Sequence, residues 1–417
     1  MRIIFFRWGN NDEDIIVNTL RKQGHFVAAF DAANMCFSDG TSNFGSNSDV
    51  YELESLGGLQ ADEMVTRLVK EASNFHAEVF FSIDYFQYIS LAAKKAGIYY
   101  YCWVYHLPQW NLYSNQAQFP CNRFFTYDHA HLRNMLRNNI KNVEYLSLAA
   151  DRKLFTGASN GISGNMLTMY VSEVSFVGNL YESSSSIFNR ISPEDKQNPV
   201  YKKIVKTIRK KMFSYGRNVL ETDITPDIVE FLMKEMESEK WNYFFASQED
   251  IVIHSVIAKK ITVEERKKVI QELAARFDFR LYTQSNTKKY PAVKNMGPVD
   301  FRKTAPLIFH QSKVNIYITP RTIATGIPLR VLEIMSCQGF VLTNYQEDLA
   351  AEFVEGKEIV MYHSLEELLE KTAYYLEHED ERQQIARAGY EKVLRDYNYA
   401  VKLSEIFTKD SCGGFLI

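Results

Sequence analysis

The sequence predicts an α/β protein whose 417 residues form two lobes. Short apolar runs, rich in β-branched and aromatic residues, alternate with helical stretches through most of the chain, a pattern typical of parallel β-α-β units. A Gly-, Ser- and Asn-rich stretch at Asp151–Met166 interrupts the alternation and has the composition of a linker. At roughly 150 residues per domain, the length also allows two or three domains.

The first lobe is predicted to span residues 1–165 as a Rossmann-like unit. Apolar runs predict strands at Arg2–Trp8, Phe26–Asp31, Ala77–Ile83, Ile98–Tyr105, Arg123–Tyr127 and Val143–Leu146. Helices are expected from the turn at Gly9–Asp12 through Gln23, over Leu59–Asn74 and Phe86–Ala96, and up to about Asn138. The polar segment Ser38–Asp49 is expected to be a loop.

The second lobe is predicted to span residues 166–395, with a charged, helical insertion at 193–248. Its strands are expected at Val174–Val177, Arg280–Thr283, Val314–Ile318, Phe340–Thr343 and Glu358–Met361. Thr262 with Glu265, and Ser364 with Glu367, have the spacing of capping boxes, which predicts that a helix starts at each place. Residues 396–417 are expected to form a helix that crosses back to the first lobe, followed by a loose tail.

Composition narrows the class of protein. The formal net charge is −3, so no global positive field attracts nucleic acid. The five cysteines are far apart and form no C-x-x-C, which suits a reducing compartment. The apolar start is too short for a signal peptide, and Ile98–Leu107 is about half the length of a membrane helix. We therefore expect a cytoplasmic protein, with no cofactor and no metal because His129, His131 and His254 lack partners at ligand spacing.

The strongest local motif is Gly326–Glu333, where a glycine turn leads into a helix. Pro328 stands in the first turn, where its missing N–H costs nothing. The free N–H groups of a helix start and the cation of Arg330 suit a phosphate, and the Glu333 carboxylate can accept both hydroxyls of a ribose. The alternative, with about equal weight, is an ordinary capped helix with a solvated Arg–Glu pair.

Other candidate residues follow predicted strands, where ligands gather in open α/β sheets. Gly178, Asn179 and Tyr181 follow the first strand of the second lobe, although a tight β-α turn explains Gly178 as well. In the first lobe, His106 is a candidate general base because imidazole titrates near neutral pH, and Asp84 is the rival base. Either residue can instead cap a helix or bond a backbone group.

The segment Trp8, Gly9 and Asn10 ends the first strand and is a candidate acceptor-side loop, with a surface turn as the equal alternative. Basic residues at helical spacing within the insertion, Lys202 to Lys211, suit contact with anionic lipid. Nearby acids such as Glu230 and Glu235 can neutralise them, and a solvated face is the favoured alternative.

Several segments together resemble CgeB-like (spore-maturation-protein) glycosyltransferases. The stretch Ser312–Tyr345, including Ile327-Pro328-Leu329-Arg330-Val331-Leu332-Glu333, carries the most specific resemblance. Weaker agreement is found at Phe176–Tyr181, Leu281–Thr283, Gly297–Asp300, Gly356–Tyr362, Trp103–Gln109 and Leu148–Asp151. The resemblance covers most of the chain in order, outside the loop Ser38–Asp49 and the tail.

This resemblance implies a GT-B architecture, two facing Rossmann-like lobes with the nucleotide-sugar donor held mainly by the second. It implies a hexosyl- or N-acetylhexosaminyltransferase that uses a nucleoside-diphosphate sugar, most readily a UDP-sugar, and an unknown sugar, protein or lipid-linked acceptor. The residues themselves suggest no metal site, so we expect the enzyme to be metal-independent. In this fold a histidine at the end of such a strand often contacts the donor sugar, which the resemblance implies for His106. The donor-binding candidates are then Arg330, Glu333, Gly178, Asn179, Tyr181, Thr325, Gly326, Ile327, Pro328 and Leu329.

The chain departs from the pattern of retaining enzymes of this fold at two places. Thr325 stands where they carry the first of two Glu residues, and Asn179 follows Gly178 where Arg is common. The stereochemical outcome therefore stays open. Two other functions also stay open: a nucleotide-sugar epimerase on the same fold, and an inactive nucleotide-sugar-binding partner protein.

Overall fold

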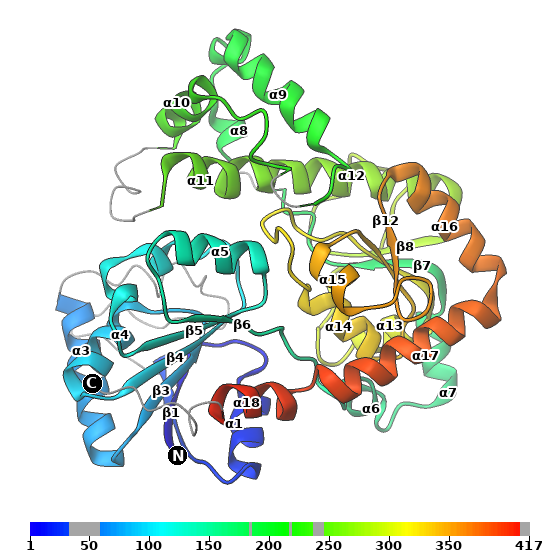
Figure 1. The fold of residues 1–417 in the computed structure, drawn as a ribbon. Coiled ribbons are helices and arrows are strands. Elements are labelled where there is room, and N and C mark those ends of the chain that lie inside the picture. Colours follow the sequence, from blue (N-terminus) through cyan, green and yellow to red (C-terminus); the bar gives the residue numbers. More distant parts are fainter. Residues whose placement is uncertain (33–58, 183–185, 217–218, 237–245, 409–417) are drawn as a thin grey trace. The chain divides into compact units, whose positions relative to one another are not determined.

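The computed structural model describes residues 1–32, 59–182, 186–216, 219–236 and 246–408 (Figure 1). The predicted loop Ser38–Asp49 and the nine-residue tail lie outside the described residues. The chain divides into two compact units, each built on a six-stranded parallel sheet. Among the described helices, none combines the length and the apolar character that crossing a membrane requires.

The first unit contains the described part of Met1–Leu148 and the late helix α18 (Tyr399–Thr408). Its sheet has the order β2-β1-β3-β4-β5-β6, and every neighbouring pair is parallel. The strands are β1 (Arg2–Arg7), β2 (Phe26–Asp31), β3 (Val79–Ile83), β4 (Tyr99–Val104), β5 (Asn122–Thr126) and β6 (Val143–Tyr145). The helices are α1 (Glu13–Lys22), α3 (Leu59–Phe75), α4 (Gln87–Ala96) and α5 (His129–Arg137).

Aromatic side chains fill the core of this unit and include helix α18. The ring of Phe81 on β3 lies 5.4 Å from Phe5 on β1 and 5.3 Å from Phe407 on α18. Since both partner rings are edge-on to Phe81, they take the arrangement that aromatic pairs prefer. Helix α18 is therefore part of the first unit although it is encoded at the end of the chain.

The second unit contains the described residues of Ala149–Asn242 and Ser247–Asn398. Its sheet has the order β12-β11-β10-β7-β8-β9, again parallel throughout. The strands are β7 (Ser172–Val177), β8 (Phe279–Tyr282), β9 (Lys294–Asn295), β10 (Ser312–Tyr317), β11 (Val341–Asn344) and β12 (Val360–Tyr362). The helices around the sheet are α12 (Ala258–Arg276), α13 (Ala305–Gln311), α14 (Leu329–Ser336), α15 (Glu347–Glu352), α16 (Leu365–Glu377) and α17 (Glu379–Asp396).

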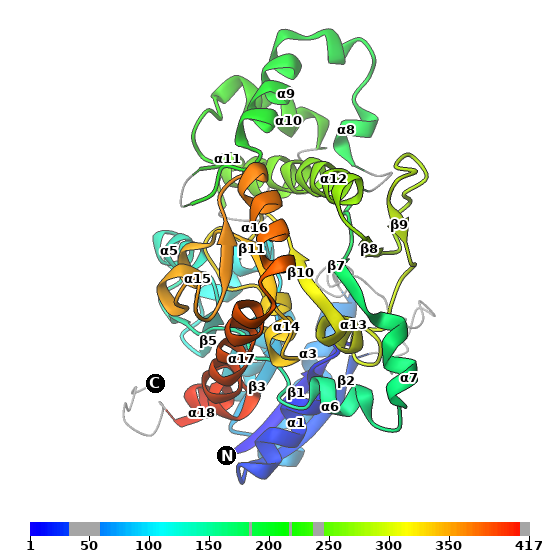
Figure 2. The same cartoon turned by 90° about the vertical axis from the view of Figure 1, so that its right-hand side faces the viewer.

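Helices cover both faces of the second sheet, as a parallel sheet requires. Figure 2 shows α13, α14 and α17 on one side and α12 and α16 on the other. Helix α14 contacts both α13 and α17, and α12 contacts α16. Gly389 on α17 allows close packing, because a Cβ there would lie 2.5 Å from the Glu358 carbonyl oxygen. The strands predicted from apolar runs are confirmed as parallel strands, and most of them are buried, whereas the edge strand Phe26–Asp31 is largely exposed.

The predicted linker contributes to the second unit rather than the first. The stretch 149–165 contains the helix α6 (Leu154–Ser159), and a further short helix, α7 (Gly164–Leu167), begins at its end. The Phe155 ring stacks on His310 of α13 at 3.9 Å, and Asp151 pairs with Arg302 at 3.4 Å. The sequence predicted that the first lobe ends at residue 165, whereas the structure divides the two units after Leu148. Linker composition did not reveal the packing of Phe155.

The insertion extends from α8 to α11, beyond the predicted bounds 193–248. Its helices are α8 (Ile187–Arg190), α9 (Pro199–Lys211), α10 (Pro226–Glu235) and α11 (Gln248–Val252), drawn in green in Figure 1. A π-helical turn at Ile253–Ile257 joins α11 to α12 without a break. The predicted helix start at Thr262 is therefore wrong: its hydroxyl donates to the Ala258 carbonyl within the helix, at 2.8 Å. Ser247 caps this continuous helix instead, because its hydroxyl accepts from Asp250 N–H. The second predicted cap, Ser364, is confirmed by a 3.1 Å bond from Glu367 N–H.

Candidate functional site

Each sheet has one point where the chain reverses its direction of travel across the strands. In the first unit this switch point lies between β1 and β3, and in the second between β7 and β10. Crevices form outside the carboxyl ends of strands at such points. The predicted residues follow these four strands or the neighbouring strand β4, so each unit brings its own candidates to one edge of its sheet.

Asp84 and His106 form a hydrogen-bonded pair in the first unit. Asp84 is fully buried with a φ of 58°, and its Oδ1 accepts the N–H groups of Tyr105 and His106 at 2.9 and 3.0 Å. Its Oδ2 lies 2.6 Å from Nδ1 of His106. Because an ionised carboxylate only accepts, Nδ1 carries the proton and Nε2 is the basic nitrogen. The His106 side chain is 56% exposed, so the pair presents a base at the surface of the unit.

The segment Trp8–Asn10 is held beside this pair by a buried carboxylate. Trp8 donates its indole N–H to the Ile83 carbonyl at 2.9 Å, and its ring lies 6.0 Å from that of His106. Oε1 of Glu13 accepts the N–H groups of Trp8, Gly9 and Asn10 at 2.8, 3.1 and 3.1 Å. Burial raises the pKa of Glu13, against the effect of these bonds. These backbone N–H groups already have an anionic acceptor in the protein.

The loop after β7 places Gly178, Asn179 and Tyr181 at the switch point of the second unit. The Asn179 side chain accepts from the Ser285 hydroxyl at 2.9 Å and from Tyr181 N–H at 2.7 Å. Tyr181 has a φ of 58° and is 50% exposed. A Cβ at Gly178 would lie 3.3 Å from the Phe176 ring, which would have to shift slightly to accommodate it. The loop is therefore fixed by its own side chains and presents an aromatic ring.

Arg266 of α12 connects the ends of β7 and β10, and sequence reasoning did not identify it. This residue is 2% exposed and donates to the carbonyl oxygens of Asn179 and Ile318. Its guanidinium also lies 4.7 Å from the Tyr181 ring centroid, a cation–π contact. A signal was present in the sequence. Arg266 and Glu265 occupy positions at which the helical period of Ile261, Val269 and Ile270 requires burial.

Arg330 and Glu333 lie at the start of α14, on the other side of the same switch point. Nη1 of Arg330 is 2.8 Å from Oε2 of Glu333, and the side chains are 17% and 13% exposed. The guanidinium also lies 4.3 Å from the Phe301 ring centroid. Burial raises the pKa of Tyr317, at the end of β10, to about 12, and charges on Arg266, Arg330 and Glu333 also act on it. The structure thus gathers these charged residues and Tyr181 around one tyrosine.

The remaining donor candidates contribute packing through their side chains. Thr325 and Ile327 are fully buried. The Thr325 hydroxyl donates to the Asp348 carboxylate at 3.3 Å, and its carbonyl accepts Asp348 N–H at 3.0 Å. Pro328 precedes the helix as its N-cap residue and Leu329 begins it, so the proline stands one position earlier than predicted. Any contact between a ligand and the stretch from Thr325 to Ile327 would involve the backbone.

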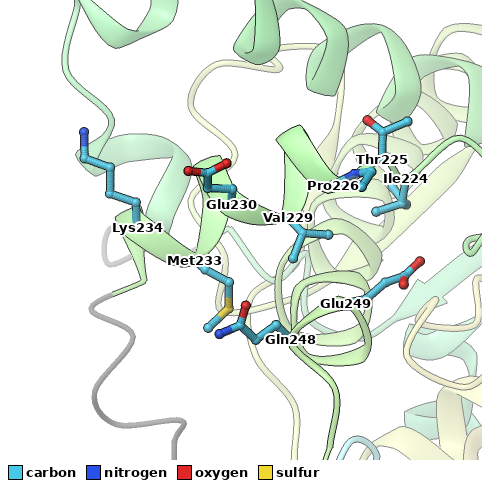
Figure 3. A pocket seen from close by; sticks show the side chains of 9 residues that line it. All are labelled: Ile224, Thr225, Pro226, Val229, Glu230, Met233, Lys234, Gln248 and Glu249. Carbon is cyan, nitrogen blue, oxygen red and sulfur yellow. The ribbon is translucent and has the colours of Figure 1, made fainter.

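A separate pocket of about 500 Å³ lies in the insertion (Figure 3). Helix α10 and the start of α11 line it, with apolar side chains such as Val229 and Met233 and charged ones such as Glu230 and Lys234. No predicted site residue is among those that line it.

The basic residues of α9 are partly neutralised within the insertion. Lys203 pairs with Asp227 at 3.1 Å, and Lys210 and Lys211 pair with Asp223 at 2.8 and 3.0 Å. Hydrogen bonds from Lys210 and Lys211 lower the pKa of Asp223. A hydrogen bond from Thr225, followed by one from Lys203, lowers the pKa of Asp227. Lys211 is also 4% exposed. These contacts favour a solvated, internally paired helix over a membrane-binding face.

Residues 264–408 match a protein-family model described as "Glycosyl transferase-like". The matched segment contains Arg266, Arg330 and Glu333. A search of curated proteins finds no match.

Solved structures with the GT-B fold cover nearly the whole chain. A glycosyltransferase from Rickettsia africae is 9% identical, with a TM-score of 0.52 and 99% of both chains covered. HepE from Anabaena, in complex with UDP-glucose, is 11% identical, with a TM-score of 0.52 and 99% of both chains covered. A putative UDP-N-acetylglucosamine 2-epimerase from Listeria monocytogenes is 11% identical, with a TM-score of 0.50, and 100% of this chain and 99% of that chain are covered. The protein therefore has the GT-B fold, as the resemblance implied.

Proposed function

We propose that this protein is a glycosyltransferase, of CgeB-like type, that transfers a hexosyl or N-acetylhexosaminyl group from a UDP-sugar. The family match supports the reaction class, because it covers the segment from α12 to α18. The complex of HepE with UDP-glucose supports the choice of nucleotide. The acceptor is a sugar, protein or lipid-linked molecule.

The Arg330–Glu333 pair at the first turn of α14 carries the proposal. In this proposal, the Glu333 carboxylate accepts hydrogen bonds from the two ribose hydroxyls, while Arg330 and the N–H groups at the start of α14 bind the diphosphate. Fixed cations of this kind stabilise the charge that develops on the leaving diphosphate, which is work that a metal ion does in other transferases. We therefore propose a reaction that needs neither metal nor cofactor.

The Asp84–His106 pair supplies the general base in this proposal. Nε2 of His106 takes the proton from the acceptor hydroxyl while the hydroxyl oxygen bonds to the anomeric carbon. The bond from that carbon to the diphosphate oxygen breaks, and UDP leaves with the electron pair. A single displacement inverts the configuration. Thr325, whose hydroxyl donates to Asp348, stands where retaining enzymes of this fold carry the first Glu, so we favour the inverting route over a retaining one.

A thermal-shift panel of nucleoside diphosphates and their sugars tests the proposal directly. A ligand that binds only the folded state raises the apparent stability by mass action. We expect UDP and at least one UDP-sugar to raise the melting temperature more than ADP and GDP do. A panel in which no nucleoside diphosphate changes the melting temperature would reject the proposed donor.

The epimerase is the second candidate, because the structure also resembles a UDP-N-acetylglucosamine 2-epimerase. An epimerase converts its UDP-sugar without an acceptor, so product analysis after incubation with the donor alone separates the two reactions. An inactive binding partner, the third possibility, would bind the donor and turn over none of a panel of acceptors.

A further inference from the structure

Arg321 is a buried arginine in the loop between β10 and α14, which leads to the proposed donor site. It is 9% exposed, and its Nε lies 3.0 Å from Oε2 of Glu265 on α12. Its backbone N–H donates to the Thr262 hydroxyl oxygen at 2.8 Å. The loop has no regular secondary structure from Ile318 to Pro328, so its conformation depends on anchors of this kind.

The other contacts of Arg321 come from the helical insertion. Nη2 donates to the carbonyl oxygens of Lys211 and Ser214, at the end of α9, at 3.0 and 2.7 Å. The Tyr215 ring centroid lies 4.3 Å from the guanidinium, and the Tyr215 hydroxyl donates to the other oxygen of Glu265. One guanidinium therefore holds together the insertion, helix α12 and the loop between β10 and α14.

Helix α12 holds both loops of the switch point through neighbouring residues. Glu265 binds Arg321 of the loop after β10, and Arg266 binds carbonyls of both loops. Lys267 pairs with Glu182 in the loop after β7, at 2.8 Å. Helix α12 continues into α11 of the insertion. The insertion is therefore attached to the two switch-point loops in two ways, through α12 itself and through Arg321.

We infer that Arg321 is a positioning residue of the donor site, and that the insertion takes part in donor binding by fixing the loop between β10 and α14. This inference rests on the proposed function. Arg321 lies only four residues before Thr325, and the fixed loop sets where the first turn of α14 begins. A guanidinium suits the task, because its planar donors can bind a carboxylate and two carbonyls at once, whereas an ammonium group cannot match this geometry.

The test compares Arg321→Gln with a matched control, Arg382→Gln. Arg382 on α17 is also buried, at 5% exposure, and also donates to a backbone carbonyl, that of Tyr375. Both variants should lower the melting temperature, because each removes a buried guanidinium. Only Arg321→Gln should weaken UDP binding, by about tenfold or more in calorimetric Kd. If Arg321→Gln does not fold, Arg321→Lys is measured in its place.

A double variant separates positioning from stability. Removing one partner of a buried ion pair leaves an uncompensated charge, and removing both relieves it. Arg321→Gln with Glu265→Gln should therefore regain part of the lost melting temperature without regaining UDP affinity. UDP binding that survives intact in Arg321→Gln or Arg321→Lys would overturn this inference alone. A parent chain that binds no UDP would overturn the proposed function as well.

Discussion

Both switch points lie beside the first strand of their own sheet, but they are held by side chains of opposite charge. In the first unit, the carboxylates of Glu13 and Asp84 accept five backbone N–H groups in total, three and two respectively. In the second unit, Arg266 and Arg321 donate to four backbone carbonyls, two each. One unit therefore fixes its loops with anions and the other with cations.

This difference matches the chemistry that each unit is proposed to perform. A carboxylate behind His106 stabilises the imidazolium that forms when the base takes a proton. In the second unit, Arg266 adds positive charge beside the proposed diphosphate site, whereas the charge of Arg321 is balanced by Glu265. Equivalent positions on the same fold can thus be specialised by the sign of the groups that hold the backbone.

The largest expected effect concerns the first unit, whose loops are held by carboxylates. His106→Ala should slow transfer by roughly 10²–10⁴-fold, the usual contribution of a general base. Asp84→Asn should also slow transfer, because an amide can no longer stabilise the protonated ring. Kinetics with a responsive acceptor measure the rates, and calorimetry with UDP should show unchanged nucleotide affinity. Equal transfer rates in His106→Ala and the parent would remove His106 from the chemistry.

The second-largest expected effect concerns the proposed donor site of the second unit. Glu333→Ala should weaken UDP binding by about 2 kcal/mol, because charged hydrogen bonds to the ribose are lost. Arg330→Ala should weaken UDP and UDP-sugar binding by a similar amount while leaving uridine binding nearly unchanged, because uridine has no diphosphate. Titration calorimetry with the three ligands distinguishes the roles. Unchanged UDP affinity in Glu333→Ala would contradict the assignment of this carboxylate to the ribose.

Local patterns in the sequence predicted most strands of both sheets, because buried parallel strands are continuous apolar runs. The short strand β9 and the helices α13 and α15 were not predicted, since each has only two to seven residues and too little periodicity. The Thr262 cap was mispredicted because an equivalent Ser-x-x-Asp signal at Ser247 already starts the helix. Local signals identify candidate helix starts but do not decide between them.

Strand ends made the candidate site partly predictable. The carboxyl ends of parallel strands meet at one edge, so His106, Asp84, Arg330 and Glu333 could be proposed from local sequence alone. The contacts of Arg266 and Arg321 could not be predicted, because their partners are carbonyls and a carboxylate that lie between 52 and 110 residues away in the chain. The helical period indicated only that Arg266 is buried. Pairing over such separations is a property of the fold. The side chains that are proposed to bind a ligand could thus be named from local sequence more readily than those that hold the loops.

The smallest effect tests whether the Glu13 carboxylate costs stability when ionised. Burial raises the pKa of Glu13 in the folded state, so the folded protein binds a proton more readily than the unfolded chain does. The contribution of Glu13 to stability is therefore fully present below its unfolded pKa and is lost as pH rises through the folded pKa. Glu13→Gln keeps an acceptor oxygen for the Trp8–Asn10 loop but cannot ionise.

We expect the free energy of unfolding of Glu13→Gln to rise relative to that of the parent between pH 4 and pH 7, by less than about 1 kcal/mol. Urea unfolding at several pH values measures this difference, with the exposed Glu194→Gln as the control that should show no such trend. If the parent instead became more stable than Glu13→Gln over this range, the three N–H bonds would affect the pKa of Glu13 more strongly than burial does. The carboxylate would then stabilise its loop as a full anion, and the contrast between the two switch points would be sharper than the pKa of Glu13 implies.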